Sequence, residues 1–320
     1  MPHGPDYWKS VLIVVPIVCT AFAALCFALR IYSRLKVLRG LRVEDVLMGV
    51  GLLCTCGVAA CIVYSFLEIG SGRDIWSFPQ EQRRQIALAN WILTKFWPSA
   101  QVFVKISILI LLRKLLGSVN WFRRSITGAI IFVVAWGITA LVGNTLQCWP
   151  VQYFWTREIG GDCMSGQTTF FIIIGALSTV EDIFILCLPL PVVWKLQMPR
   201  HEKIELTILF TIGCLVCIFS ILRIVELQRY ETSNLTYASS FSLIWAILEL
   251  DMAIVCGSFL LMKPVLLGCL GVIWKRVSNL GSRSTTPPFR RNRLWLRGIR
   301  IRVHMSQCAS KSLQMRGIVR

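Results

Sequence analysis

Residues 179–196 read TVEDIFILCLPLPVVWKL, and this stretch decides between a soluble fold and a membrane-spanning one. Two carboxylates, Glu181 and Asp182, stand at the head of an apolar run that also contains Pro189 and Pro191. In a soluble protein the acids would mark a helix start facing water, whereas inside a lipid-spanning helix they are costly and need partners. The prolines predict that a helix bends or ends near them.

The composition of the surrounding chain favours the membrane. Of its 320 residues 55% are hydrophobic and 16% are charged, while soluble domains carry about 25% charged residues. Seven apolar runs are long enough to cross the bilayer, whose hydrocarbon core is ~30 Å thick, and they lack the alternation of barrel strands. We therefore predict an all-α polytopic membrane protein, a seven-transmembrane-helix bundle over residues 11–262. The runs are 11–33, 45–67, 87–112, 125–146, 168–192, 204–226 and 239–262.

The first run admits one alternative. Ala21-Phe22-Ala23 resembles a signal-peptidase site. Cleavage there would leave the basic segment from Arg30 to Arg42 outside the membrane, against the positive-inside tendency. We predict an uncleaved first helix, preceded by a short extracellular N-terminus, residues 1–10.

Basic residues gather in alternate connections, after the first, third and fifth runs, and again after the seventh. This pattern places the N-terminus outside and the tail, residues 263–320, in the cytoplasm. The net charge of +18 is therefore a topology signal plus a basic tail, and we predict no nucleic-acid partner. The connecting basic residues are Arg34, Lys36, Arg39, Arg42, Arg113, Lys114, Arg123, Arg124, Lys195, Arg200 and Lys203.

Two features fall in loops assigned to the outside. Asn234-Leu235-Thr236 is a glycosylation sequon, although its closeness to the seventh span leaves its use open. Cys148 and Cys163 flank another outer loop, where an oxidising environment allows a disulfide. Two free thiols are the alternative.

A family likeness runs through residues 10–265. It is carried by Arg30, Tyr32, Arg34, Glu44 and Asp45; Lys105-Ile106-Ser107-Ile108 and Arg113; Cys148-Trp149-Pro150, Trp155 and Cys163; Asp182, Pro189, Pro191, Trp194-Lys195-Leu196, Lys203, Gly213 and Arg223; and Trp245, Glu249, Cys256 and Pro264. In order and spacing these residues resemble the fungal rhodopsin-domain integral membrane family, of satratoxin-cluster type and related to fungal Pth-type candidate G-protein-coupled receptors. Asp74 stands where that family usually has a histidine, and Ser178 or Thr179 where an asparagine is common.

The resemblance suggests retinal, but the residues do not. Retinal needs a lysine buried in mid-membrane, usually on the seventh helix. Residues 239–262 contain no lysine, and Lys263 falls at the predicted cytoplasmic edge. We therefore predict that the protein uses no retinal and no other cofactor. Two sequence signatures of animal receptors are absent as well. The third run ends in Leu111-Leu112-Arg113-Lys114, without an acid-arginine-aromatic triplet, and the seventh run has no Asn-Pro-x-x-Tyr.

Ionisable residues inside the spans are the candidate functional residues, because charges in lipid usually face the bundle interior and find partners. At about 1.5 Å rise per residue, Lys105 and Asp182 lie at the same depth. We predict an ion pair between them, with Glu249 as a second acidic element. Structural support, a switch operated by ligand or proton, and a transport pathway are the open roles. The predicted buried polar core is Lys105, Asp182, Glu249, Lys95 and Arg223.

Depth and helical geometry add three expectations. Glu181 lies about 100° around the helix from Asp182, so the two are predicted to face different partners. Arg223 is predicted near the outer interface, where its long stem can snorkel. Lys95 is predicted in the outer third of the third span.

The tail after residue 262 has two predicted parts. Residues 265–277 have helical spacing and are predicted to lie along the inner leaflet; the remainder is predicted to be mostly disordered. Six arginines beside apolar residues favour contact with anionic lipid, with a partner-binding arm or a gene-model error as alternatives. They are Arg290, Arg291, Arg293, Arg297, Arg300 and Arg302.

These observations predict a class of function. His3, His201 and His304 lie far apart, so we predict no metal site, and no arrangement of a nucleophile and a base suggests an enzyme. The resemblance implies a receptor-like plasma-membrane protein of unknown small-molecule ligand, with a heterotrimeric G protein as partner or a tie to a secondary-metabolite gene cluster. The alternative is a small-molecule or ion/proton transporter that uses Lys105, Asp182 and Glu249.

Overall fold

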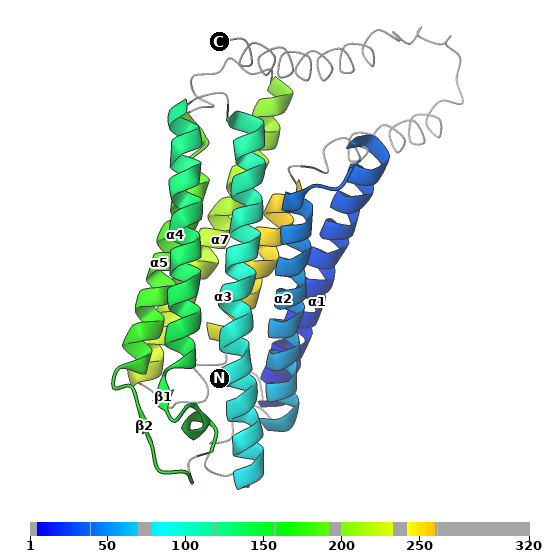
Figure 1. Cartoon of the computed structure of the whole chain (residues 1–320). Helices are drawn as coiled ribbons and strands as arrows, with labels where there is room; N and C mark the ends of the chain where they lie inside the picture. The colour runs from blue at the N-terminus through cyan, green and yellow to red at the C-terminus, as the bar shows by residue number, and fades with distance from the viewer. Residues whose placement is uncertain are drawn as a thin grey trace, which may run out of the picture. The chain divides into compact units, whose positions relative to one another are not determined.

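The computed structural model describes residues 5–38, 40–69, 79–117, 120–156, 158–191, 200–232, 242–259 and 261. All of these residues belong to one compact unit, residues 1–268. Seven helices in this described part are long and apolar enough to cross a membrane, and they run alternately up and down as a bundle (Figure 1). The predicted all-α, seven-helix fold is confirmed.

Each predicted span is overlapped by one helix, although the helix ends differ from the predicted ends by up to seven residues. They are α1 (Pro5–Ser33), extended by a π-helical turn (Arg34–Leu38), α2 (Val43–Ile69), α3 (Gln80–Leu116), α4 (Asn120–Thr145), β1 (Cys148–Trp149), a 3-10 turn (Val151–Phe154), β2 (Asp162–Cys163), α5 (Gln167–Cys187), α7 (Arg200–Thr232) and the seventh helix (Ser242–Phe259).

The strands β1 and β2 pair antiparallel, with Cys148 opposite Cys163. This small hairpin lies at the end of the bundle where α3 begins and α4 ends (Figure 1). We call it the hairpin end, and we call the other end, which holds the connection between α1 and α2, the opposite end.

The fifth helix ends where the prolines predict. The Leu188 N–H donates to the Phe184 carbonyl over 3.0 Å just after the helix ends at Cys187. Pro189 has no N–H with which to continue this ladder, and residues 188–189 form a turn. The helix is therefore shorter than the apolar run that predicted it.

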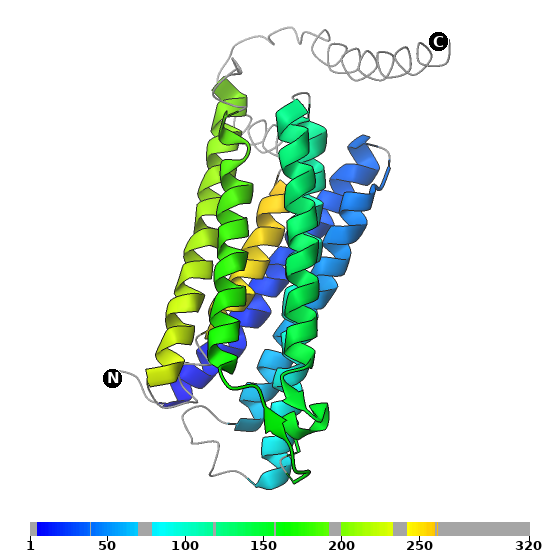
Figure 2. The same cartoon turned by 60° about the vertical axis from the view of Figure 1, so that its left-hand side comes forward.

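Two helices form the interior of the bundle. In the spanning window of the seventh helix 61% of residues are buried and in that of α3 50%, against 22–33% in the other five. In Figure 2 the seventh helix, in orange, lies between the α5–α7 pair and the α1–α2 pair. Residues that connect helices are therefore expected mainly on α3 and the seventh helix.

The outer faces of the bundle are apolar and exposed. Val14, Leu53, Ile131 and Val180 come from four different helices, and between 53% and 71% of each is exposed. Exposed apolar surface on this scale is unusual for a soluble monomer but suits contact with lipid tails.

Close approach of α2 and α3 depends on Gly51. A Cβ at this position would lie 2.6 Å from a methyl carbon of Val104. Small residues at helix contacts are a common device of membrane bundles, because dispersion contacts drive packing there.

Several predicted features lie outside the described residues. These are the sequon at Asn234, the helix 265–277 and the six tail arginines Arg290, Arg291, Arg293, Arg297, Arg300 and Arg302. They stay predictions.

Candidate functional site: a buried polar network and an adjoining cavity

Lys105 lies at the centre of a buried cluster that joins α3 to α5. Its Nζ is 3.0 Å from Asp182 Oδ1, which is the predicted ion pair, and the Lys105 residue is 2% exposed. It also donates to the Ser178 hydroxyl over 2.9 Å and to the Ser178 carbonyl over 3.0 Å. The Ser220 hydroxyl of α7 donates to Asp182 over 3.0 Å, so three helices meet here.

The expectation for Glu181 was wrong. Its Oε2 lies 3.1 Å from Lys105 Nζ, so Glu181 and Asp182 share one ammonium. The other oxygen, Glu181 Oε1, has no hydrogen-bond partner among the described residues.

Glu249 forms a second node of the network, on the seventh helix. It accepts from Gln101 Nε2 of α3 over 2.7 Å and from Arg223 Nε of α7 over 2.8 Å. Glu249 is fully buried and Arg223 is 6% exposed. The expectation that Arg223 snorkels to the outer interface was therefore wrong. Arg223 points inward because Glu249 offers it an ionic partner, and Gly175 of α5 leaves room beside its Nη1.

The group around Lys105 and the group around Glu249 lie one helical turn apart. Gln101 and Lys105 are successive inward residues of α3, and Ser220 and Arg223 are neighbours on one face of α7. We call the combined group the central network. With every group ionised it holds two cations and three carboxylates: Lys105, Arg223, Glu181, Asp182 and Glu249.

A separate ionic group, the end cluster, lies at the opposite end of the bundle. Arg30 is fully buried, lies 2.8 Å from Asp45 and donates to the Gly257 carbonyl over 2.8 Å. Arg34 lies 2.9 Å from Glu44, whose second oxygen contacts Lys114 of α3. The cluster therefore ties α1, α2, α3 and the seventh helix together.

A cavity of about 310 Å³ opens beside the central network, toward the hairpin end. Its lining includes Trp97 of α3, Arg223 of α7 and Ile174 of α5, and the Asn144 and Gln147 amides lie nearer the hairpin. This volume falls at the lower end of the range of about 300–1,000 Å³ that small-molecule sites occupy.

Arg223 joins the cavity to the network. Its guanidinium carbon lies 4.4 Å from the centre of the Trp97 ring, and the same side chain is paired with Glu249. A molecule that entered the cavity would therefore contact a residue that holds α3, α7 and the seventh helix in one arrangement.

Lys95 belongs to the cavity region rather than to the central network. Its Nζ donates to the Asn144 carbonyl over 2.6 Å and lies 4.3 Å from the centre of the Trp91 ring. It lies more than two turns of α3 from Lys105.

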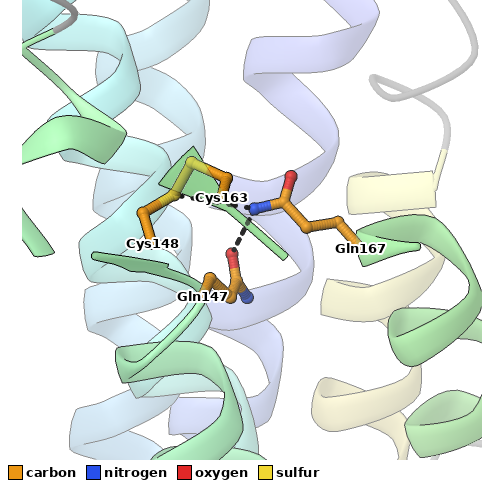
Figure 3. The surroundings of a disulfide bond; sticks show 4 residues. All are labelled: Gln147, Cys148, Cys163 and Gln167. Atoms are coloured by element: carbon orange, nitrogen blue, oxygen red, sulfur yellow. Dashed lines mark hydrogen bonds between the residues drawn. A yellow bond between two sulfur atoms is a disulfide. The ribbon is translucent and has the colours of Figure 1, made fainter. Parts of the chain in front are cut away.

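The hairpin contains the predicted disulfide between Cys148 and Cys163. Figure 3 shows Gln147 and Gln167 beside it, with the Gln167 amide donating to Gln147 Oε1 over 3.3 Å. Both glutamines line the cavity. The disulfide thus fixes the strand that carries part of the cavity rim.

Sequence reasoning missed the end cluster as a buried structure, because Arg34 was assigned to a loop. The signal was present: two arginines lie one turn apart at the end of α1, and an acidic pair begins α2. It also missed Asp251, which is 2% exposed and accepts from the Thr20 hydroxyl of α1 over 3.2 Å.

Fold and site together define a multi-pass helical membrane protein. It has a cavity of small-molecule size between the hairpin end and a buried ionic network. The chain matches the Fungal rhodopsin domain over residues 29–268. It belongs to that family.

Curated relatives agree with this assignment. The chain is 27% identical over 265 residues to a protein named Receptor GIN3 from Arthrobotrys oligospora, covering 81% of this chain and 62% of that protein. It is 26% identical over 299 residues to Fugralins biosynthesis cluster protein 2 of Gibberella zeae, covering 88% of this chain and 72% of the relative. It is 29% identical over 157 residues to Satratoxin biosynthesis SC1 cluster protein 4 of Stachybotrys chartarum, covering 49% of this chain and 56% of the relative. No solved structure matches significantly.

Proposed function

We propose that this receptor-like membrane protein binds a small molecule in the hairpin-end cavity and signals through a heterotrimeric G protein at the opposite end. One observation carries the proposal: Arg223 lines the cavity and is also the ionic partner of Glu249 on the seventh helix. A ligand that shifts Arg223 changes the contact that joins α7 to the seventh helix. A ligand acts on such an equilibrium only through different contacts in the two states.

The orientation is part of the proposal. The hairpin end faces outward, and the opposite end faces the cytoplasm at the plasma membrane. Basic residues at the opposite end support this by the positive-inside tendency; they include Lys36, Arg113, Lys114, Arg123 and Arg124. The disulfide supports it as well, since such bonds form in oxidising compartments.

We propose further that the protein acts without retinal, despite its family name. The seventh helix, Ser242–Phe259, carries no lysine for a Schiff base. Among the described residues, Lys105 of α3 is the one buried lysine, and it contacts two carboxylates and Ser178. Its amine is held as an ion-pair partner, which disfavours covalent attachment to an aldehyde.

The test uses purified protein in lipid nanodiscs together with a fungal Gα subunit. We expect the protein to accelerate guanine-nucleotide exchange on Gα, and we expect Glu249→Gln to change the basal rate because it weakens the link to Arg223. Arg84→Met, which replaces an exposed cation near the hairpin-end start of α3, serves as a control for a general charge effect. No acceleration with a folded protein would contradict the proposed coupling.

A transporter is the second candidate, and one observation favours it. The central network places five ionisable groups inside the bundle, as proton and ion pathways often do. Proton flux into liposomes that contain the protein would support this candidate, provided that Lys105→Met or Asp182→Asn abolishes it. Flux without any effect on Gα would replace the receptor proposal.

A further inference from the structure

We propose that the hairpin-end cavity binds a neutral, mainly apolar molecule, and that a carbonyl-type oxygen of this molecule accepts hydrogen bonds from Trp97 and Arg223. The inference rests on the proposed function, because it specifies the ligand of that same cavity. It follows from three properties of the cavity: unused donors, local charge and lining.

Two residues of the cavity lining carry buried donors that have no hydrogen-bond partner among the described residues. Among the described residues, neither Trp97 Nε1 nor Arg223 Nη2 has a hydrogen-bond partner, although both atoms are buried. Trp97 is 9% and Arg223 6% exposed, and both residues line the cavity. A buried donor without a partner has lost its hydrogen bond to water and gained none in return, so an acceptor that reaches both donors removes that penalty.

The donors lie in the part of the cavity farthest from the hairpin. Trp97 is the lining residue of α3 farthest from its start at Gln80, and Arg223 lies one turn deeper along α7 than Leu227. The Arg223 guanidinium lies against the Trp97 ring, so the two side chains are neighbours at this end of the cavity. Because both donor atoms are buried in the present arrangement, an oxygen in the cavity would accept from them after a small shift of the two side chains.

Formal charge decides against an anion. Glu249 already neutralises Arg223, and the central network has three carboxylates to two cations when all are ionised. An added carboxylate would meet uncompensated negative charge in a medium of low dielectric constant. A neutral ketone, ester or amide oxygen meets the same donors without this repulsion.

The remaining lining suits an apolar body. Leu93, Phe154, Phe171, Ile174 and Leu243 supply aliphatic and aromatic surface. A primarily apolar pocket with a few polar groups that orient the ligand is the usual form of a small-molecule site.

The experiment compares three probes of similar shape on the full-length protein in nanodiscs. Benzylacetone is a neutral ketone, phenylbutyrate is its carboxylate analogue, and butylbenzene lacks an acceptor. Binding is measured by ligand-observed NMR titration. We expect benzylacetone to bind about tenfold more tightly than butylbenzene, which is the effect of one satisfied buried donor, and phenylbutyrate to bind more weakly than the ketone.

Two variants locate the effect. Trp97→Phe keeps a ring beneath Arg223 but removes one N–H, so it should reduce the ratio of benzylacetone affinity to butylbenzene affinity. Ala246→Phe fills the cavity and should abolish binding of both. Thermal unfolding of each variant shows whether it has folded, and the three-probe comparison on the native protein needs no variant.

Each contrary result overturns the inference. Equal binding of ketone and hydrocarbon, tighter binding of phenylbutyrate, no binding of benzylacetone, or no effect of a folded Trp97→Phe would each show that the ligand chemistry is different. The Gα exchange experiment uses none of these probes, so the proposed function is judged separately.

Discussion

The end cluster and the central network are two buried ionic groups of the same size with opposite charge balance. When all groups are ionised, the end cluster has three cations, Arg30, Arg34 and Lys114, for two carboxylates. The central network has two cations for three carboxylates. The excess cation of the end cluster is Lys114, whose side chain is 41% exposed and reaches water. The excess carboxylate of the central network is not exposed in this way, because the side chains of Glu181, Asp182 and Glu249 are at most 9% exposed.

The two groups also differ in how completely they are hydrogen-bonded. In the end cluster both oxygens of Glu44 and both of Asp45 have ionic partners. Arg34 Nε of the end cluster makes no hydrogen bond among the described residues, but it lies 3.1 Å from the carboxylate oxygen Asp45 Oδ2. In and beside the central network, three buried atoms lack hydrogen-bond partners among the described residues: Glu181 Oε1, Arg223 Nη2 and Trp97 Nε1. The comparison indicates that the end cluster stabilises the packing of the helices, while the central network has buried hydrogen-bonding atoms without partners next to a cavity.

The largest effect is expected from Lys105→Met. This change leaves Glu181 and Asp182 buried without a cation, and breaking a buried pair in this way costs about 3–5 kcal/mol. The free energy of unfolding in detergent micelles measures it, with Arg84→Met, an exposed cation on the same helix, as control. If the effects of Lys105→Met and Asp182→Asn simply add in the double variant, the ion pair has no energetic weight.

The next largest effect is expected from Glu44→Gln. It leaves Arg34 and Lys114 with a neutral partner, but Lys114 can turn to water and Asp45 still binds Arg34. We expect a loss of about 2–3 kcal/mol in the same unfolding measurement. If Glu44→Gln lowers the free energy of unfolding more than Lys105→Met does, the exposure of Lys114 does not relieve the excess positive charge of the end cluster.

A smaller effect is expected from Asp182→Asn. Lys105 keeps Glu181 as a partner, and removal of one acid brings the formal charges of the central network into balance. The expected cost is about 1 kcal/mol, which is the loss of hydrogen bonding at one site. A loss as large as that of Lys105→Met would mean that Glu181 does not compensate Lys105.

The smallest effect is expected from Lys114→Met. The side chain is 41% exposed, and ion pairs that reach solvent contribute about 0–1 kcal/mol. Removal of this lysine also balances the end cluster. Raising the salt concentration should change the stability of the native protein and of this variant by nearly the same small amount; a large difference between them would contradict the prediction.

Hydropathy predicted seven membrane-spanning helices, a fixed rise per residue predicted the level at which Lys105 meets Asp182, and the two prolines predicted where α5 ends. The same depth rule failed for Arg223, which was expected at the outer interface and instead pairs with the buried Glu249. The error at Glu181 is one of direction around the helix axis. That direction depends on which neighbours pack against each face, and neighbours such as Gly175 beside Arg223 come from distant parts of the chain.

The end cluster shows a second reason for such errors. Positive residues near a span end serve equally well as topology signals and as buried partners of nearby acids. Composition alone does not separate the two roles. The acidic pair at the start of α2 was the distinguishing feature, because it offers Arg30 and Arg34 partners only 10 to 15 residues away.

The disulfide between Cys148 and Cys163 has a consequence for where the protein acquires its ligand site. The helices need only a bilayer to form, but Gln147 and Gln167 at the cavity rim lie beside that bond. Chains inserted under reducing conditions would therefore carry a complete bundle with a loosened rim. Preparations made in cell-free lysates and in the secretory pathway should differ in ligand binding while their helical content is the same.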